Sequence, residues 1–390
     1  MRPRSAPWRR GASPARRAAR LAAWLGRLAL AGACAGLPVA QAGQPVLPSH
    51  DGQVLERLPA RMALGASRDA QAARADARQL LEQARALGDP RPAGQALARL
   101  APWRHDAGAP PALLVTLAEV EQYLHRFDDA VRRLDGVLQR DPAQPQAWLM
   151  LAALHRVQGR LADAERACQA LQALRAQPWA AACAAEGQGL RGEFDAARER
   201  FNGLLQRSSD AGTRGWLYTS LAELEQRAAR PEAADSAWQQ AVATDGALYA
   251  RIGRADFLLD QGRAAEAWDL LRDAPDADGV LLRRAIAAQR SGRPEAARLA
   301  RTVRERQAQA DQRPGGNGHE RERSLQLLAL ERQPCAAWQA AQRNVALQRE
   351  AIDLLLLHRA AQACGRAEAL AEARATAQRT GLVDLRREAL

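Results

Sequence analysis

The chain contains no lysine, and this absence narrows the chemistry that it can perform. All 56 basic residues are arginines, and aromatic residues make up only 4% of the 390 positions. Without lysine there is no phosphate-binding P-loop. The sequence also lacks an H-E-x-x-H zinc motif, a G-x-S-x-G nucleophile elbow, a C-x-x-C redox motif and a C-x-x-C-H haem motif.

The histidines add no metal or catalytic site. They are scattered along the chain and never occur at the spacing of metal ligands, at His50, His105, His125, His155, His319 and His358. We therefore expect a protein that is not an enzyme, with no catalytic residues, no metal and no cofactor.

Residues 1–42 have the pattern of an export signal. They contain eight arginines and no acidic residue, followed by the apolar runs 28–33 and 35–39 and by the cleavage pattern Ala40-Gln41-Ala42. The apolar run is too short to span a bilayer comfortably. The pattern predicts a cleaved Sec-type signal peptide. The alternatives are an uncleaved leader that anchors the chain, a lipoprotein acylated at Cys34, and a twin-arginine signal.

Removal of this leader changes the charge of the chain. The formal net charge is +12 for the whole sequence, with 56 basic and 44 acidic residues. Without the eight leader arginines, 48 basic residues remain against 44 acidic ones, which is a net charge of +4. Both signs are interspersed, so we expect solvated helix faces and no nucleic-acid partner.

Residues 111–178 contain two consecutive helical hairpins of the same design. Ala130 and Ala164 occupy equivalent positions, which gives a period of 164 − 130 = 34 residues. Apolar residues recur at helical spacing within each half, and a polar turn at His125-Arg126 or Gly159-Arg160 separates the halves.

This pair of hairpins resembles the tetratricopeptide repeat, whose pattern is W-x2-L-G-x2-Y, then A-x3-F, then Pro. The second copy fills the first set of positions with Trp148, Leu151, Ala152 and His155, while Ala130-x3-Leu134 and Ala164-x3-Cys168 fill the later ones. The resemblance implies an all-α fold, a right-handed superhelical solenoid of helical hairpins. It also implies that the first helix of each hairpin lines the inner face.

Weaker copies extend the pattern along the chain. We expect an irregular lead-in at 43–66, a repeat array at 67–310, a flexible loop at 311–319, and C-terminal degenerate repeats with a capping helix at 320–390. The A-x3-F positions of the further copies are Ala197 to Phe201, Ala234 to Trp238, Ala267 to Leu271 and Ala297 to Arg301.

The four cysteines that follow the leader form two candidate disulfides. Antiparallel neighbouring helices bring together residues whose numbers sum to about twice that of the turn between them. The sums 168 + 183 = 351 and 335 + 364 = 699 point to turns near Gln177 and Arg349. We therefore expect Cys168–Cys183 and Cys335–Cys364 bridges in an exported protein. The alternative is that each cysteine is a small buried core residue.

The resemblance also implies which residues line the inner groove. The candidates are Glu119, Gln122, Tyr123, Met150, Ala153, Arg156, Trp179, Glu186, Trp216, Glu223 and Arg227. The row formed by Glu119, Glu186 and Glu223 favours a basic or extended peptide partner. The alternatives are that the tryptophans pack against the preceding repeat and that the glutamates are ordinary solvated residues. Some relatives bind a terminal carboxylate through lysine and asparagine, a pattern that this chain does not reproduce.

These observations predict a non-catalytic scaffold or adaptor that binds a protein or peptide partner in the periplasm of a bacterial envelope. The alternatives are a membrane-tethered envelope-assembly lipoprotein, an accessory factor to a membrane transporter, and a helical lytic enzyme with a buried catalytic glutamate.

Overall fold

A computed structural model describes residues 69–106, 108–312 and 319–387 of the chain. These residues all belong to one compact unit, Pro59–Leu390. The predicted signal peptide at 1–42, the lipidation candidate Cys34, the lead-in at 43–66 and most of the predicted loop at 311–319 lie outside the described residues.

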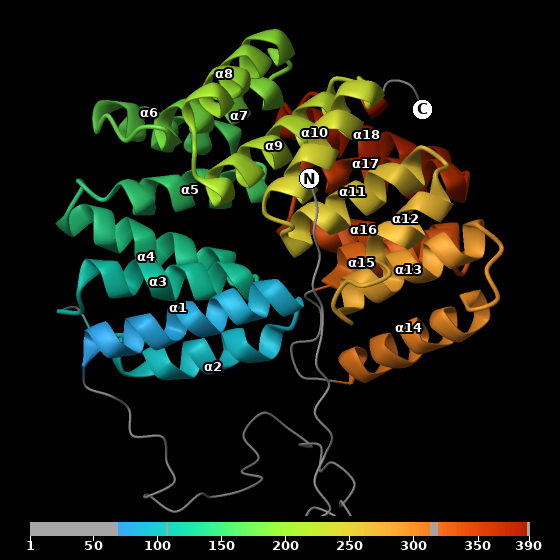
Figure 1. Cartoon of the computed structure of the whole chain (residues 1–390), viewed down its shortest axis with the longest axis horizontal. Helices are drawn as coiled ribbons and strands as arrows, with labels where there is room; N and C mark the ends of the chain where they lie inside the picture. The colour runs from blue at the N-terminus through green and yellow to red at the C-terminus, as the bar shows by residue number, and fades with distance from the viewer. Residues whose placement is uncertain (1–68, 107, 313–318, 388–390) are drawn as a thin grey trace, which may run out of the picture. The chain divides into compact units, whose positions relative to one another are not determined.

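The described residues form α-helices joined by short turns, and no strand occurs among them. The helices pair in order as nine antiparallel hairpins (Figure 1). Their bounds are α1 Ala70–Leu87, α2 Pro90–Leu100, α3 Pro111–Tyr123, α4 Phe127–Arg140, α5 Pro145–Val157, α6 Leu161–Ala173, α7 Trp179–Leu190, α8 Phe194–Arg207, α9 Ala211–Arg227, α10 Pro231–Thr244, α11 Leu248–Asp260, α12 Ala264–Leu271, α13 Asp278–Arg290, α14 Ala296–Asp311, α15 Glu320–Ala329, α16 Pro334–Leu347, α17 Ala351–Cys364 and α18 Ala367–Thr380. The described residues also include two short 3₁₀ helices, η2 (Ala101–Trp103) and η4 (Leu385–Arg387). The predicted all-α solenoid of helical hairpins is confirmed.

The repeated alanine explains how each hairpin packs. Five of the predicted alanines are at most 2% exposed, namely Ala130, Ala164, Ala197, Ala234 and Ala267. The larger residue four positions later is buried as well, at Leu134, Cys168, Phe201, Trp238 and Leu271. A methyl side chain at the crossing lets the two helices approach closely, and the larger residue fills the remaining space.

The sixth predicted copy does not follow this pattern. Ala297 and Arg301 are both exposed, and α14 instead buries Leu299 and Val303. The alanine assignment in this repeat was therefore wrong. The reason is physical: α14 begins at Ala296, so its buried stripe lies on the bulkier residues of the next turn.

The C-terminal hairpins contact turns in the N-terminal half of the chain. The Arg349 N–H donates to the Val157 carbonyl at 2.6 Å, and the Val383 N–H donates to the Leu190 carbonyl at 2.9 Å. The side chains of Gln348 and His125 are also within hydrogen-bond distance, at 3.2 Å. The segments before α17 and after α18 thus lie against the turns that follow α3, α5 and α7.

Candidate functional site

The first two predicted groove residues tie α3 to α1. Glu119 forms an ion pair with Arg85 at 2.9 Å. The Tyr123 hydroxyl donates to the Ala84 carbonyl at 2.9 Å, and burial raises the pKa of Tyr123. Both side chains therefore have partners within the protein, and Gln122 beside them is partly buried.

Met150 does not line a groove. It is 5% exposed and belongs to the same core as Leu117 and Leu154. Its assignment as a groove residue was wrong, because the side chain points into the packing between neighbouring helices. Ala153, one turn further along α5, is partly exposed.

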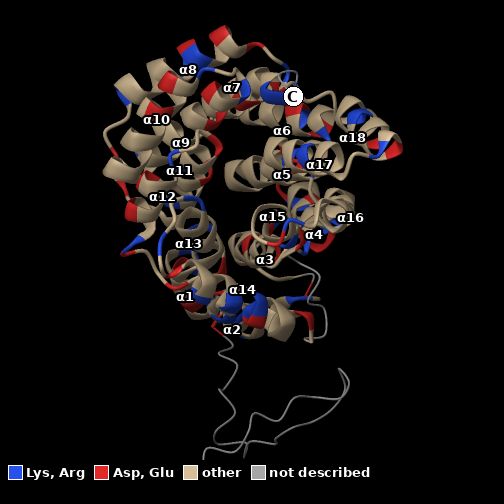
Figure 2. Cartoon of the chain, turned by 90° about the vertical axis from the view of Figure 1, so that its right-hand side faces the viewer, with Lys and Arg blue, Asp and Glu red and all other residues tan. Residues whose placement is uncertain are grey.

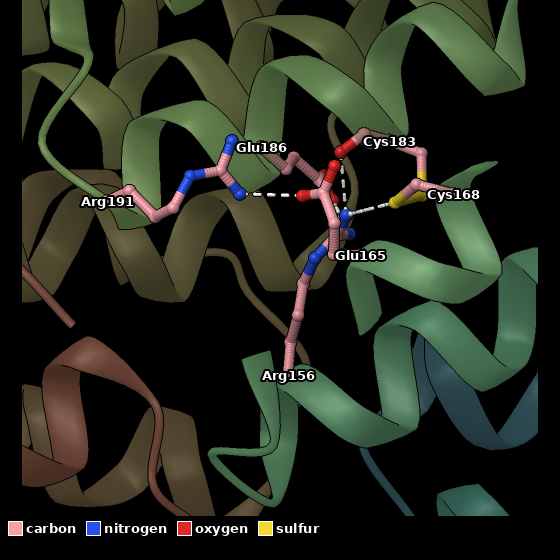
Figure 3. The surroundings of a disulfide bond; sticks show 6 residues. All are labelled: Arg156, Glu165, Cys168, Cys183, Glu186 and Arg191. Atoms are coloured by element: carbon pink, nitrogen blue, oxygen red, sulfur yellow. Dashed lines mark hydrogen bonds and ion pairs between the residues drawn. A yellow bond between two sulfur atoms is a disulfide. The ribbon is translucent and has the colours of Figure 1, made fainter. Parts of the chain in front are cut away.

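Arg156 is the most connected of the predicted residues. It lies on α5 and forms an ion pair with Glu186 of α7, while its Nη2 donates to the Cys183 carbonyl at 2.7 Å (Figure 3). The other Glu186 oxygen accepts a hydrogen bond from the Ser220 hydroxyl of α9 at 3.1 Å. A continuous polar chain thus crosses three successive inner helices.

Trp179 and Trp216 belong to neighbouring repeats and contact each other. Their ring centroids are 5.4 Å apart with an interplanar angle of 47°, and both side chains are partly exposed. Trp179 begins α7 and Trp216 lies in the second turn of α9. Trp216 also packs against the core that contains Phe201 and Leu217, so the pair leaves only part of its aromatic surface open at the N-terminal ends of α7 and α9.

Tyr249 extends this arrangement to α11, and the sequence analysis missed it. Its side chain is 63% exposed, and its hydroxyl donates to Glu223 at 2.7 Å. The repeat spacing was the signal that could have found it, because 249 − 216 = 33 residues separate it from Trp216. We call Trp179, Trp216, Glu223 and Tyr249 the aromatic–acid surface.

Glu223 has no ion-pair partner among the described residues, in contrast to Glu119 and Glu186. It is partly exposed but enclosed by the surrounding helices, and this burial raises its pKa to about 7. The Tyr249 hydrogen bond and nearby Arg227 lower the pKa, while Glu350 and Glu186 raise it further. The net effect is a pKa well above the ordinary value of 4.5 for a glutamate.

Arg227 lies on the same helix, one turn after Glu223. Its side chain is 7% exposed, and its Nε has no hydrogen-bond partner in the part of the chain described. Burial lowers its pKa, an effect that Glu223 and Asp384 partly offset. The Arg227 side chain is thus buried one turn from Glu223, whose charge acts on it electrostatically.

The predicted row of acid is mostly neutralised. Arg85 of α1 pairs with Glu119, and Arg156 of α5 pairs with Glu186, so only Glu223 keeps an unpaired carboxylate. The sequence pattern of one helix cannot show these arginines, because they come from other helices. Figure 2 shows the same interspersion of acidic and basic residues over the described helices.

Both predicted cysteine pairs lie at disulfide distance. The sulfur atoms are 2.04 Å apart in Cys168–Cys183 and 1.96 Å apart in Cys335–Cys364. The first bridge links α6 to α7 and the second links α16 to α17. The structure therefore fits the bridges expected from helix geometry.

Among the described residues, no cluster of three histidine, cysteine, aspartate or glutamate side chains could hold a metal ion. None of the helices described has the length and apolar character needed to cross a membrane.

Comparison with known proteins identifies the repeat. Residues 115–178 match the family model described as tetratricopeptide repeat, which confirms the predicted resemblance there. The comparison with curated proteins gave no match.

Several solved structures are similar to the chain. They include Pseudomonas aeruginosa PilF, at 14% identity and a TM-score of 0.38, covering 52% of this chain and 92% of that one. A tetratricopeptide repeat protein from Parabacteroides merdae has 13% identity and a TM-score of 0.38, covering 73% and 99%. Another from Thermus thermophilus has 16% identity and a TM-score of 0.33, covering 56% and 99%. None of these likenesses carries an argument about function.

Proposed function

We propose that this tetratricopeptide repeat protein is a non-catalytic scaffold that binds an extended protein segment on its aromatic–acid surface, in the periplasm of a bacterium. The observations that carry the proposal are the ring contact between Trp179 and Trp216 and the hydrogen bond from Tyr249 to Glu223, which lies on the same helix as Trp216. Exposed aromatic side chains supply large, rigid contact area and are enriched at protein interfaces. Their position on three successive inner helices suits a partner that lies along the repeats.

The charges of this surface favour a partner with a basic side chain. Glu223 is the one glutamate of the predicted row that has no cation within ion-pair distance among the described residues. An arginine or lysine of the partner would place its charge on Glu223 and its aliphatic stem on the Tyr249 ring. This contact favours the charged form of Glu223, so binding would lower its pKa and weaken in acid.

Two features support the proposed location in the periplasm. The leader pattern at 1–42 is that of an exported protein, and two cysteine pairs stand at disulfide distance. Disulfides persist in the periplasm and are rare in the cytosol. A tether through Cys34 or an uncleaved leader would place the same scaffold at the membrane, and the mass of the mature N-terminus tests that alternative.

A lytic enzyme is the second candidate, and one observation favours it. A glutamate with a pKa of about 7 holds a proton near neutral pH, as the general acid of glycoside hydrolysis must. Glu223 is the residue that would act. Incubation of the protein with peptidoglycan, and with an E223Q variant as control, tests this candidate by the release of soluble fragments.

The scaffold is tested by affinity capture from an envelope extract with the mature chain as bait. The test variants are E223Q and W216A. The matched control is the pair E199A and E232A, which removes exposed glutamates from the second helices α8 and α10. A specific protein that the wild type and the control recover, and that the test variants lose, supports the proposal. Equal recovery by the wild type, the control and both test variants contradicts the assignment of the surface.

A further inference from the structure

One of the two disulfides has an arginine lying directly on it. The Nη2 atom of Arg156 is 3.1 Å from the sulfur of Cys168 and 3.3 Å from that of Cys183. The arginine side chain is 12% exposed, and each cysteine is 1% exposed. Figure 3 shows the guanidinium beneath the bridge, between α5, α6 and α7.

This contact suits a reduced bridge better than an oxidised one. The sulfur atoms of a disulfide are neutral and accept hydrogen bonds only weakly, whereas a thiolate is an anion that a guanidinium stabilises strongly. The Arg156 Nε is also buried without a hydrogen-bond partner among the described residues. The guanidinium already pairs with Glu186 through Nη1, while its Nη2 faces the two sulfurs, so a thiolate formed by reduction would be a second anionic partner for the same cation.

A small hollow lies beside the bridge. It has a volume of about 10 Å³, room for roughly one water molecule, and is lined by Arg156, Leu161, Ala164, Glu165, Cys168, Gly187, Leu190 and Arg191. Cys168 is the cysteine in this wall, and Gly187 contributes no side chain there. Because both cysteines are 1% exposed, a thiol must reach the Cys168 sulfur through a local opening of this wall.

The charges that surround the bridge leave Arg156 as its main electrostatic partner. Glu186 of α7 is paired with Arg156 and accepts from Ser220, and Glu165 of α6 is paired with Arg191 at 2.6 Å. Both carboxylates are thus neutralised by arginines. Only Arg156 of these charged groups makes a direct contact with sulfur.

We propose that Cys168–Cys183 is a thiol-exchange site that a dithiol reductant can open, with Arg156 holding the released thiolate. One thiolate of the reductant attacks the Cys168 sulfur, the bond between the two sulfurs breaks, and Cys183 leaves as a thiolate beside Arg156. The second thiol of the reductant then displaces Cys168 from the mixed disulfide. The products are the oxidised reductant, one cysteine thiol, one cysteine thiolate and a proton released to solvent.

The second disulfide is a control within the same chain. Cys335 and Cys364 are partly exposed, and the contact recorded for the Cys335 sulfur is the Cys364 carbonyl at 3.5 Å. No arginine contact to these sulfurs occurs among the described residues. A change at Arg156 should leave the reduction of this bridge unaltered.

The experiment compares wild type, R156Q and R166Q during reduction by dithiothreitol. Arg166 is an exposed arginine of α6, so R166Q removes a nearby positive charge that does not contact the bridge. Samples are quenched with an alkylating agent, and mass spectrometry reports each bridge separately. We expect R156Q to slow the reduction of Cys168–Cys183 about tenfold, because a poorly stabilised thiolate is a poorer leaving group. R166Q should reduce at the wild-type rate.

A second measurement does not depend on a variant that folds. In the reduced wild type, the alkylation rate of the Cys168 and Cys183 thiols is followed against pH. We expect its midpoint about one pH unit or more below that of a free cysteine. Unchanged reduction in a folded R156Q variant, or a wild-type midpoint at or above that of free cysteine, would overturn the proposal.

Discussion

The Tyr249 hydroxyl donates a hydrogen bond of 2.7 Å to the Glu223 carboxylate, and it thereby links α11 to α9 on the inner side of the repeats. This contact fixes the exposed tyrosine ring next to the one unpaired glutamate of the predicted groove. The proposed binding surface depends on it, because the ring and the carboxylate would hold the same partner side chain.

The Y249F variant tests this hydrogen bond. The hydroxyl lowers the pKa of Glu223 by donating to its charged form. Its removal should therefore raise the pKa of Glu223 above its wild-type value of about 7. NMR titration of the labelled Glu223 carboxyl carbon measures the shift. Y218F is the matched control, since Tyr218 contacts Arg214 instead, and an unchanged titration in Y249F would refute the role of the hydroxyl.

Glu223 should also make stability depend on pH. Its pKa is raised from 4.5 to about 7 in the folded state, so the folded protein binds one more proton than the unfolded chain between these values. The contribution of Glu223 to the free energy of unfolding is therefore largest below pH 4.5, and it falls as the pH rises towards 7. E223Q removes this loss. Relative to wild type, E223Q should gain on the order of 1 kcal/mol between pH 5 and pH 8, after allowance for solvent screening.

Calorimetric melting of both proteins at the two pH values measures this gain. The E232Q variant, which changes an exposed glutamate of α10, controls for the loss of one charge. If wild type and E223Q keep a constant difference in stability from pH 5 to pH 8, Glu223 does not titrate in this range.

Gly192 should be less tolerant of substitution than Gly262. Both occupy turns with positive φ, of 88° and 74°, so alanine would be strained at either site. At Gly192 a Cβ would also meet the Val383 side chain at 3.2 Å, whereas nothing lies within 4 Å at Gly262. We expect G262A to cost about 1 kcal/mol from strain alone and G192A to cost more. Chemical denaturation measures both.

A double variant at Gly192 and Val383 tests the contact between the C-terminal segment and the end of α7. If the excess cost of G192A comes from Val383, then V383A should recover part of it in the double variant. If the double variant is no more stable than G192A, the excess loss of stability in G192A does not come from the Val383 side chain.

Glu121 and Glu119 should differ sharply although they lie on one helix. Glu121 is fully buried and pairs with Arg133 at 2.7 Å, whereas the Glu119–Arg85 pair is partly exposed. Breaking a buried pair leaves an uncompensated charge, so E121A should cost about 3 kcal/mol. E119A should cost less than about 1 kcal/mol. Denaturant unfolding measures both losses of stability. Similar losses for the two variants would contradict the difference in burial between the two ion pairs.

Local patterns in the sequence were sufficient to predict the repeated hairpins. The 34-residue spacing of Ala130 and Ala164 reflects the crossing of two helices, which depends on residues close in the chain. The cysteine pairing followed for the same reason, since Cys168 and Cys183 flank one turn. In α14 the pattern misled, because alanine is common in this sequence and Ala297 lies on the exposed face.

The site was predicted less well because its decisive contacts join distant residues. The repeat pattern placed Trp216 and Glu223 on an inner helix, but it could not show that arginines of other helices neutralise Glu119 and Glu186. The contact of Val383 with Leu190 spans 383 − 190 = 193 residues and leaves no local periodicity. Tyr249 could have been found by extending the Trp179 and Trp216 positions by one more repeat.

Site-specific photo-crosslinking in living cells tests the scaffold most directly. A photoreactive phenylalanine analogue replaces Tyr249 in one strain and the exposed Glu232 of α10 in another. We expect a discrete protein adduct from position 249, none from position 232, and loss of the adduct when W216A is added. Adducts of equal yield at both positions, or an adduct at 249 that W216A leaves unchanged, would contradict binding at the aromatic–acid surface.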